Sequence, residues 1–148
     1  MTLGDPQENA DRLFAKGEDL ADSSEAGAAL NCFRAAWESL PEPRESSPSA
    51  IRILGAIADE SFFSGQWQEC QDAVQRAFQC GADLANPFLR LRLGQALFEL
   101  GDVDAAKGWL VPAYLSEGPS LFADEDAKYL DFLRYELLPP PGGWPRGW

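Results

Sequence analysis

The sequence predicts an all-α fold built from helical hairpins that stack on one another, and two observations support this prediction. Apolar residues recur at spacings of three and four along most of the 148-residue chain, which is the spacing of one helix face. Similar segments also return at a period in the mid-thirties, as shown by the 36 residues between the turn glycines Gly65 and Gly101. Two helices repeated at this period cannot bury their apolar faces alone, so each hairpin is expected to stack on the next.

The first expected hairpin covers about residues 10–41. Its first helix carries Phe14 and Gly17 at helical spacing, and its second helix places Ala29 and Phe33 on one face. A proline- and serine-rich linker, PEPRESSP, then ends this unit and lets the next one begin.

Two further hairpins are expected at about residues 50–80 and 87–117. In the third hairpin, Gly94 is small where two helices must approach closely, and Ala106 offers a shallow place on the facing helix. A Gly-Asp turn at Gly101 joins these two helices, which therefore pack antiparallel.

A capping helix at about residues 124–138 is expected to close the stack, with Asp124 or Asp126 as its N-cap. Three prolines and paired glycines oppose a helix in the last segment, residues 139–148, so this tail is expected to be extended. Its two tryptophans, Trp144 and Trp148, are unusual in such a segment. We expect the tail to fold back on a groove or to meet a partner.

Length and charge restrict the classes of function. The chain is long enough for one domain, expected at residues 1–138, and it lacks a membrane-length apolar run or a signal peptide. We therefore expect a cytoplasmic protein. There are 24 acidic and 12 basic side chains, a net charge of −12, so a nucleic-acid partner is not expected and a basic protein is a more natural one. An acidic surface that serves solubility alone is the alternative.

Catalysis, cofactors and metals have no support in the sequence. The chain has no histidine, and no carboxylate, lysine, tyrosine or cysteine lies in a recognised catalytic motif. The cysteines Cys32, Cys70 and Cys80 lack a metal-binding spacing and are expected to be free thiols. No glycine-rich phosphate loop is present, and the acidic residues 124–126 lack the spacing of a calcium loop. We expect a protein that is not an enzyme and holds no cofactor.

The hairpins resemble the tetratricopeptide repeat (TPR), whose unit reads W-x2-L-G-x2-Y, then A-x3-F, then P. The third hairpin has Leu93-Gly94-x2-Leu97 followed by Ala106-x3-Leu110. The first has Lys16-Gly17-x2-Leu20 followed by Ala29-x3-Phe33, whereas the second replaces the glycine with Ala58. The resemblance covers roughly residues 10–119. It implies a right-handed superhelical stack of three hairpins with a capping helix.

The resemblance also implies a binding surface, because family members bind peptides or proteins on the concave face formed by the first helix of each hairpin. We call this predicted surface the inner face. Its expected residues are Asp11, Phe14 and Glu18 in the first hairpin, Arg52, Asp59, Phe62 and Phe63 in the second, and Phe88, Leu91, Arg92, Gln95, Phe98 and Glu99 in the third. Each aromatic residue in this set is also consistent with ordinary packing between repeats.

One TPR subclass clamps the C-terminal carboxylate of a chaperone with lysine, arginine and asparagine on this face. Here only Arg52 and Arg92 are basic, and Glu18 and Asp59 oppose them. That role is therefore not expected.

The third hairpin and the segment after it are also similar to small bacterial repeat proteins encoded beside secreted toxins, which act as immunity proteins. This similarity implies a protein-binding module that neutralises a basic toxin. We also expect a monomer or weak homodimer and no membrane partner. A secretion chaperone for an effector and a generic scaffold or adaptor are the alternatives. An immunity protein would bind a folded toxin domain, whereas a chaperone would bind an extended segment of its client.

Overall fold

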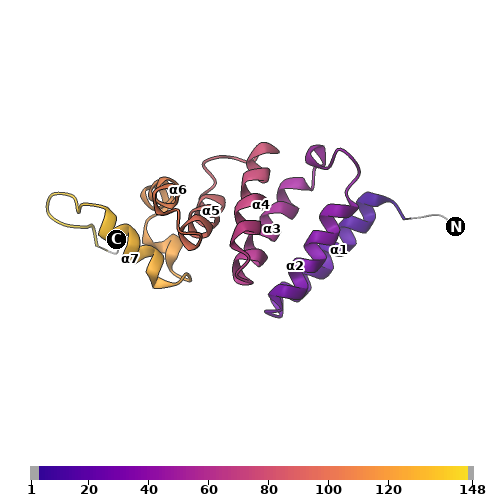
Figure 1. Ribbon diagram of the computed structural model, residues 1–148, viewed down its shortest axis with the longest axis horizontal. Helices are drawn as coiled ribbons and strands as arrows, with labels where there is room; N and C mark the ends of the chain where they lie inside the picture. Colours follow the sequence, from indigo (N-terminus) through magenta and orange to yellow (C-terminus); the bar gives the residue numbers. More distant parts are fainter. Residues whose placement is uncertain (1–3, 147–148) are drawn as a thin grey trace. The chain divides into compact units, whose positions relative to one another are not determined.

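The computed structural model describes residues 4–146, and these form α-helices, two short 3-10 helices and loops, without a β-strand (Figure 1). The chain divides into two compact units, residues 1–83 and 84–148, which we call unit 1 and unit 2 and describe separately. The expected all-α class is thus confirmed. The single domain expected from chain length stays a prediction.

Unit 1 contains two antiparallel helical hairpins, and the second helix of the first hairpin packs against the first helix of the second (Figure 1). The elements are α1 (Pro6–Asp22), α2 (Ala26–Ser39), the 3-10 helix η1 (Arg44–Ser46), α3 (Ala50–Phe63) and α4 (Trp67–Gln79). Helix α1 begins four residues earlier than expected, because the Asp5 side chain accepts a hydrogen bond from the Gln7 N–H and Pro6 occupies the first helical position.

Unit 2 contains one hairpin followed by a final helix. Its elements are α5 (Pro87–Glu99), α6 (Val103–Glu117), the 3-10 helix η2 (Pro119–Phe122) and α7 (Ala127–Glu136). The Asn86 side chain caps α5 by accepting from the N–H groups of Phe88 and Leu89. Gly101 makes the tight turn between α5 and α6 with a φ of 88°, a left-handed conformation that glycine adopts without strain.

The glycines of the TPR pattern allow the two helices of a hairpin to meet. A Cβ atom added to Gly94 would lie 2.5 Å from Cγ of Leu110, and one added to Gly17 would lie 2.5 Å from a ring carbon of Phe33. In both hairpins the large residue follows the glycine by sixteen positions. At the same interval α3 and α4 carry Ala58 and Val74, both fully buried. The larger alanine thus stands at the position equivalent to the glycine, and a smaller valine at the position equivalent to Leu110 or Phe33.

Helix α7 is shorter than the expected capping helix. Asp126 caps it by accepting from the Lys128 N–H, and Leu137 after its last residue is extended, with a ψ of 133°. Helix α7 ends at Glu136, two residues before the expected end at about Leu138, since residues that precede a proline, here Pro139, are disfavoured in the helical conformation.

The tail folds back on unit 2 rather than running extended. The Gly143 N–H donates to the Pro140 carbonyl at 2.8 Å, closing a turn. The Trp144 ring then meets the buried Tyr114 ring edge-on, with centroids 6.1 Å apart. The predicted fold-back is therefore seen for Trp144, whereas Trp148 lies outside the described residues.

The remaining expectations for the fold concern cysteines and membranes. Cys32, Cys70 and Cys80 are thiols outside any disulfide, and Cys70 is buried while the other two are half-buried. Among the helices of residues 4–146, none combines the length and the apolar character that crossing a bilayer requires.

Candidate functional site

In unit 1, the inner-face residues of α1 and α3 contact one another. Phe14 is buried and its ring lies 5.2 Å from that of Phe33 on α2. The Arg52 guanidinium lies over the Phe14 ring, 4.4 Å from its centroid, and also pairs with Asp11 at 3.6 Å. Arg52 is therefore engaged by both an aromatic face and a carboxylate of its own chain.

The most exposed part of this face lies at the end of α3. The Phe62 ring packs 5.7 Å from Phe63 and 5.5 Å from Trp67, which anchors the cluster to the start of α4. Phe63 keeps 60% of its surface exposed. Asp59 precedes Phe63 by one helical turn and is exposed, as is Glu18 on α1. Unit 1 thus presents an exposed aromatic ring beside an acidic side chain.

In unit 2, two of the predicted residues are held inside the chain. Gln95 is fully buried, and its side-chain amide donates to Glu125 at 2.7 Å. Arg92 donates to Gln95 at 2.9 Å and forms an ion pair with Glu125, and the Arg92 and Glu125 side chains are only 12% and 10% exposed. Gln95 has no surface for a partner, and the charge of Arg92 is already neutralised.

Phe98 and Glu99 are covered by α7. The Phe98 ring lies 5.5 Å from Tyr129 and 5.1 Å from Phe132. The Tyr129 hydroxyl donates to Glu99 at 2.7 Å, and Lys128 forms an ion pair with the same carboxylate. These contacts attach α7 to α5, so Phe98 and Glu99 serve packing within unit 2.

The pKa values follow from this geometry. Burial raises the pKa of Glu99, but the hydrogen bonds from Lys128 and Tyr129 outweigh burial and hold that pKa below its usual range. Burial and the hydrogen bond to Glu99 raise the pKa of the Tyr129 hydroxyl. Glu99 is thus ionised and Tyr129 neutral at physiological pH.

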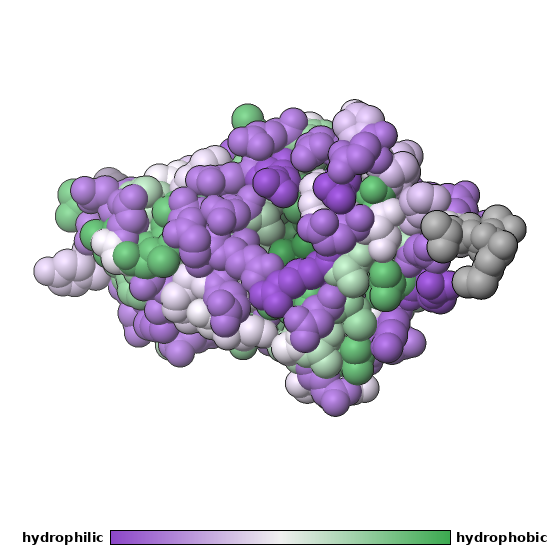
Figure 2. Space-filling model, turned by 45° about the vertical axis from the view of Figure 1, so that its right-hand side comes forward, coloured by the Kyte–Doolittle hydropathy of each residue, from purple (hydrophilic) through white to green (hydrophobic). Residues whose placement is uncertain are grey.

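The remaining α5 residues differ in exposure. Leu91 is buried, whereas Phe88, in the first turn of α5, is 68% exposed. Figure 2 shows one face of the molecule, on which hydrophilic residues predominate and hydrophobic residues form smaller areas. Among the predicted inner-face residues of unit 2, Phe88 has the side chain most exposed to a partner, because the others are buried or contact α7 and the segment before it.

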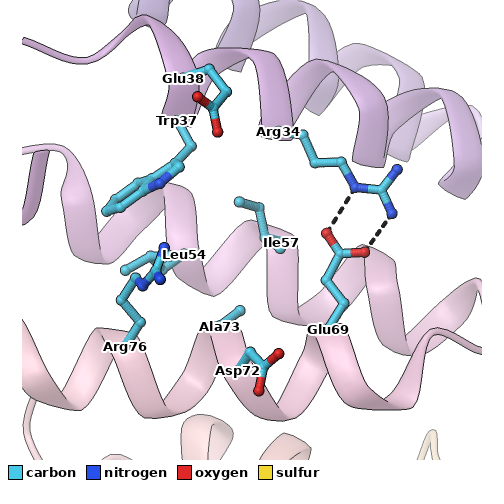
Figure 3. Close-up of a pocket in the computed structure, with 9 residues that line it drawn as sticks. All are labelled: Arg34, Trp37, Glu38, Leu54, Ile57, Glu69, Asp72, Ala73 and Arg76. Carbon is cyan, nitrogen blue, oxygen red and sulfur yellow. Dashed lines mark hydrogen bonds and ion pairs between the residues drawn. The ribbon is translucent and has the colours of Figure 1, made fainter.

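The structure also contains a groove in unit 1 that the sequence interpretation missed. It has a volume of about 520 Å³ and is lined by α2 and α4, the second helices of the two hairpins, and by α3, which runs between them (Figure 3). Its lining residues are Arg34, Trp37, Glu38, Leu54, Ile57, Glu69, Asp72, Ala73 and Arg76.

Cross-helix contacts mark two ends of this α2–α4 groove (Figure 3). At one end Arg34 makes a two-pronged pair with Glu69, with Nε donating to Oε2 at 2.7 Å. This hydrogen bond raises the pKa of Arg34. At the other end the Arg76 guanidinium lies 5.8 Å from the Trp37 ring centroid. Arg34 and Glu69 carry opposite charges and lie 35 residues apart in the sequence, a relation that helical spacing within one hairpin does not reveal.

The described part of the chain, residues 4–146, holds no group of three or more cysteine or acidic side chains arranged to bind a metal ion.

Two solved structures are similar to this chain over most of its length. The first TPR of Spaghetti (RPAP3), bound to the HSP90 peptide SRMEEVD, matches 87% of this chain and 93% of its own, with 16% identity and a TM-score of 0.60. The N-terminal domain of stress-induced protein-1 (STI-1) from C. elegans matches 88% of this chain and 98% of its own, with 18% identity and a TM-score of 0.61. No protein-family model matches the sequence, and no curated protein is similar to it. The chain has the fold of a tetratricopeptide-repeat domain.

Proposed function

We propose that this chain is a protein-interaction module that binds and neutralises a basic toxin domain in the cytoplasm, as an immunity protein. The observation that carries the proposal is the charge of unit 1, which has fifteen acidic and six basic side chains and a net charge of −9. An acidic surface attracts a basic partner over distance and speeds association. The alternative role of the acidic residues, solubility alone, predicts no specific partner.

The contact residues that we propose are the exposed ones of the inner face. In unit 1 these are Glu18, Asp59 and Phe63, which are two exposed carboxylates and a large aromatic side chain that is 60% exposed. Aromatic anchors of this kind dominate binding energy at many interfaces. In unit 2 we propose Phe88.

The other predicted residues are proposed to shape the face rather than touch the partner. Phe14, Arg52 and Phe62 support it in unit 1. Arg92, Gln95, Phe98 and Glu99 fix α5 and α7 in unit 2.

An acidic peptide such as the SRMEEVD segment bound to RPAP3 is not the ligand that we propose. Arg52 and Arg92, the basic residues predicted on the inner face, are both paired with carboxylates of this chain. An incoming acidic peptide would compete with Asp11 and Glu125 for these arginines, and the net charge of the chain would repel it.

The test is a growth assay in cells that express a basic toxin-like domain encoded beside this protein's gene. Co-expression of this chain should restore growth. Replacing Asp59 with lysine and Phe63 with alanine should abolish rescue, whereas Asp131→Lys, an exposed charge reversal on α7, should preserve it. Equal loss of rescue with Asp131→Lys would show that net charge alone acts and would refute the proposed contact residues.

A secretion chaperone is the second candidate, and the peptide held by the similar RPAP3 domain favours it. A chaperone would bind an unfolded or N-terminal segment of an effector and raise its solubility without rescuing growth. Binding to the folded domain alone would exclude this candidate.

A further inference from the structure

We propose that the α2–α4 groove of unit 1 is a second docking site, which takes an extended segment of a partner protein carrying a lysine or arginine next to an aliphatic side chain. The groove lies between the second helices of the hairpins, whereas the proposed inner-face contacts come from the first helices. This docking site therefore does not depend on the toxin-binding proposal.

The floor of the groove suits an aliphatic side chain. Leu54 and Ile57 of α3 and Ala73 of α4 lie between the two walls (Figure 3). The volume of about 520 Å³ falls within the range of pockets that hold small ligands, roughly 300–1,000 Å³. Apolar atoms placed on this floor leave water, which supplies the non-specific part of the binding energy.

The walls favour a positive charge. The two-pronged pair between Arg34 and Glu69 neutralises both of these residues. The other charged residues that line the groove are two acids, Glu38 on α2 and Asp72 on α4, and one base, Arg76 on α4. These three residues give the groove a net negative charge.

The remaining charges are not equally available. Glu38 lies 3.3 Å from Arg44 but is 72% exposed, so solvent screens this pair. The described contact of Asp72 is with a neutral group, the Gln68 amide at 3.0 Å. Arg76 is directed to the Trp37 ring. Asp72 is thus the carboxylate most ready to accept an ammonium or guanidinium group.

Lysine and arginine fit this combination because their carbon stems cover apolar surface while their charged heads reach a polar rim. The stem would lie along Leu54 and Ile57, and the head would meet Asp72. The net charge of −9 on unit 1 favours the same partners, since an acidic segment would meet repulsion before it reached Arg76.

The three isoleucines of the chain make the test site-specific. Ile57 lines the groove, whereas Ile51 and Ile53 do not, so selective ¹³C labelling of isoleucine methyl groups gives one reporter and two internal controls. The full-length protein is titrated with the peptide acetyl-Gly-Leu-Lys-Leu-Arg-Gly-amide and with a matched peptide in which glutamate replaces both basic residues. The basic peptide should shift the Ile57 signal saturably, and the acidic peptide should not.

Two variants locate the binding. Asp72→Arg should lower the affinity for the basic peptide by about fivefold, which is the order of magnitude expected when a partly exposed charge pair is lost. Asp131→Arg, the same charge change on α7, should leave its affinity unchanged. Ala73→Phe should fill the groove and abolish binding of the basic peptide. If circular dichroism shows that this variant does not fold, the comparison of Asp72→Arg with Asp131→Arg tests the proposal instead.

Three results would overturn the proposal: no shift of Ile57, equal shifts of all three isoleucines, or equal weakening by Asp72→Arg and Asp131→Arg. The last two would indicate general attraction to an acidic chain. Because the titration uses no toxin, its failure leaves the growth assay unaffected.

Discussion

Replacing Gly94 with alanine tests whether close helix contact holds the hairpin of unit 2 together. The added Cβ would lie 2.5 Å and 2.6 Å from two carbons of Leu110 and 3.3 Å from the Ala106 carbonyl oxygen. Distances below 3.0 Å do not occur between such atoms, so Leu110 must move or the helices must separate. Leu110 is fully buried and has little room to move.

The expected magnitude is a balance of two effects. Overpacking a buried contact costs about 1–3 kcal/mol. Alanine is favoured over glycine inside a helix by about 0.8–1.0 kcal/mol. We therefore expect Gly94→Ala to lower the free energy of unfolding by about 1 kcal/mol. An open helical glycine, Gly108 on α6, is the matched control, because a Cβ there meets no atom within 4 Å and Gly108→Ala should stabilise the protein.

The hairpin of α3 and α4 supplies the compensating change. The residues at the equivalent positions are Ala58 and Val74. Leu110→Val removes the δ-carbons, one of which lies 2.6 Å from the added Cβ, and so should relieve part of the clash made by Gly94→Ala. On its own, Leu110→Val should cost about 1 kcal/mol for the lost methylene group. In urea denaturation followed by circular dichroism, the double variant should be more stable than the sum of the single changes by about 0.5–1 kcal/mol. Additive effects, or a stabilising Gly94→Ala, would refute the close-contact reasoning.

Three further predictions concern unit 2. Glu99→Gln should make the free energy of unfolding less dependent on pH in the acid range. The pKa of Glu99 is depressed in the folded state, so the stability contributed by its carboxylate is complete above the ordinary pKa and is lost as pH falls through the folded value. Urea denaturation at a series of pH values would detect the difference. Trp144→Ala should destabilise the protein by about 1 kcal/mol, because the ring contact with Tyr114 is lost. Tyr135→Ala, which removes a ring that is 88% exposed, should not destabilise it. Equal free energies of unfolding for the two variants would contradict the contact between the tail and unit 2. Asn86→Ala should cost about 1 kcal/mol in a thermal melt by removing the α5 cap, and Asn86→Asp should retain most of that stability.

The hairpins were predictable because local signals set them. Gly17 and Gly94 mark close helix contacts and Gly101 marks a turn, and the structure places the first two inside α1 and α5 and the third in the turn between α5 and α6. The early start of α1 was also readable, since Asp5 followed by Pro6 is a helix-start signal.

The burial and the contact partners of the inner-face residues could not be predicted from the helical periodicity of the sequence. Gln95 is buried because Glu125, thirty residues away, accepts its amide hydrogen bond, and helical spacing carries no information about that partner. Glu99 is engaged for the same reason, through Tyr129 on α7. Helical spacing predicted that these residues share one side of α5, but it carries no information about α7, whose Tyr129 contacts Glu99 there.

The α2–α4 groove was missed because attention to the first helix of each hairpin followed from the family resemblance. A comparison of second helices pairs Phe33 with Val74, 41 residues later, and so does not match Arg34 with Glu69, 35 residues later. The depth of the groove depends on small residues such as Ala73, whose alignment with a neighbouring helix appears only in three dimensions.

The most direct test of the central claim is the affinity of the purified protein for a folded basic toxin-like domain encoded beside its gene, measured by calorimetry at two salt concentrations. We predict a 1:1 complex that weakens as salt rises and is lost when Asp59 and Phe63 are replaced, because exposed charges are screened and the aromatic anchor is removed. Absence of a complex at low salt, or a complex indifferent to both replacements, would contradict the account.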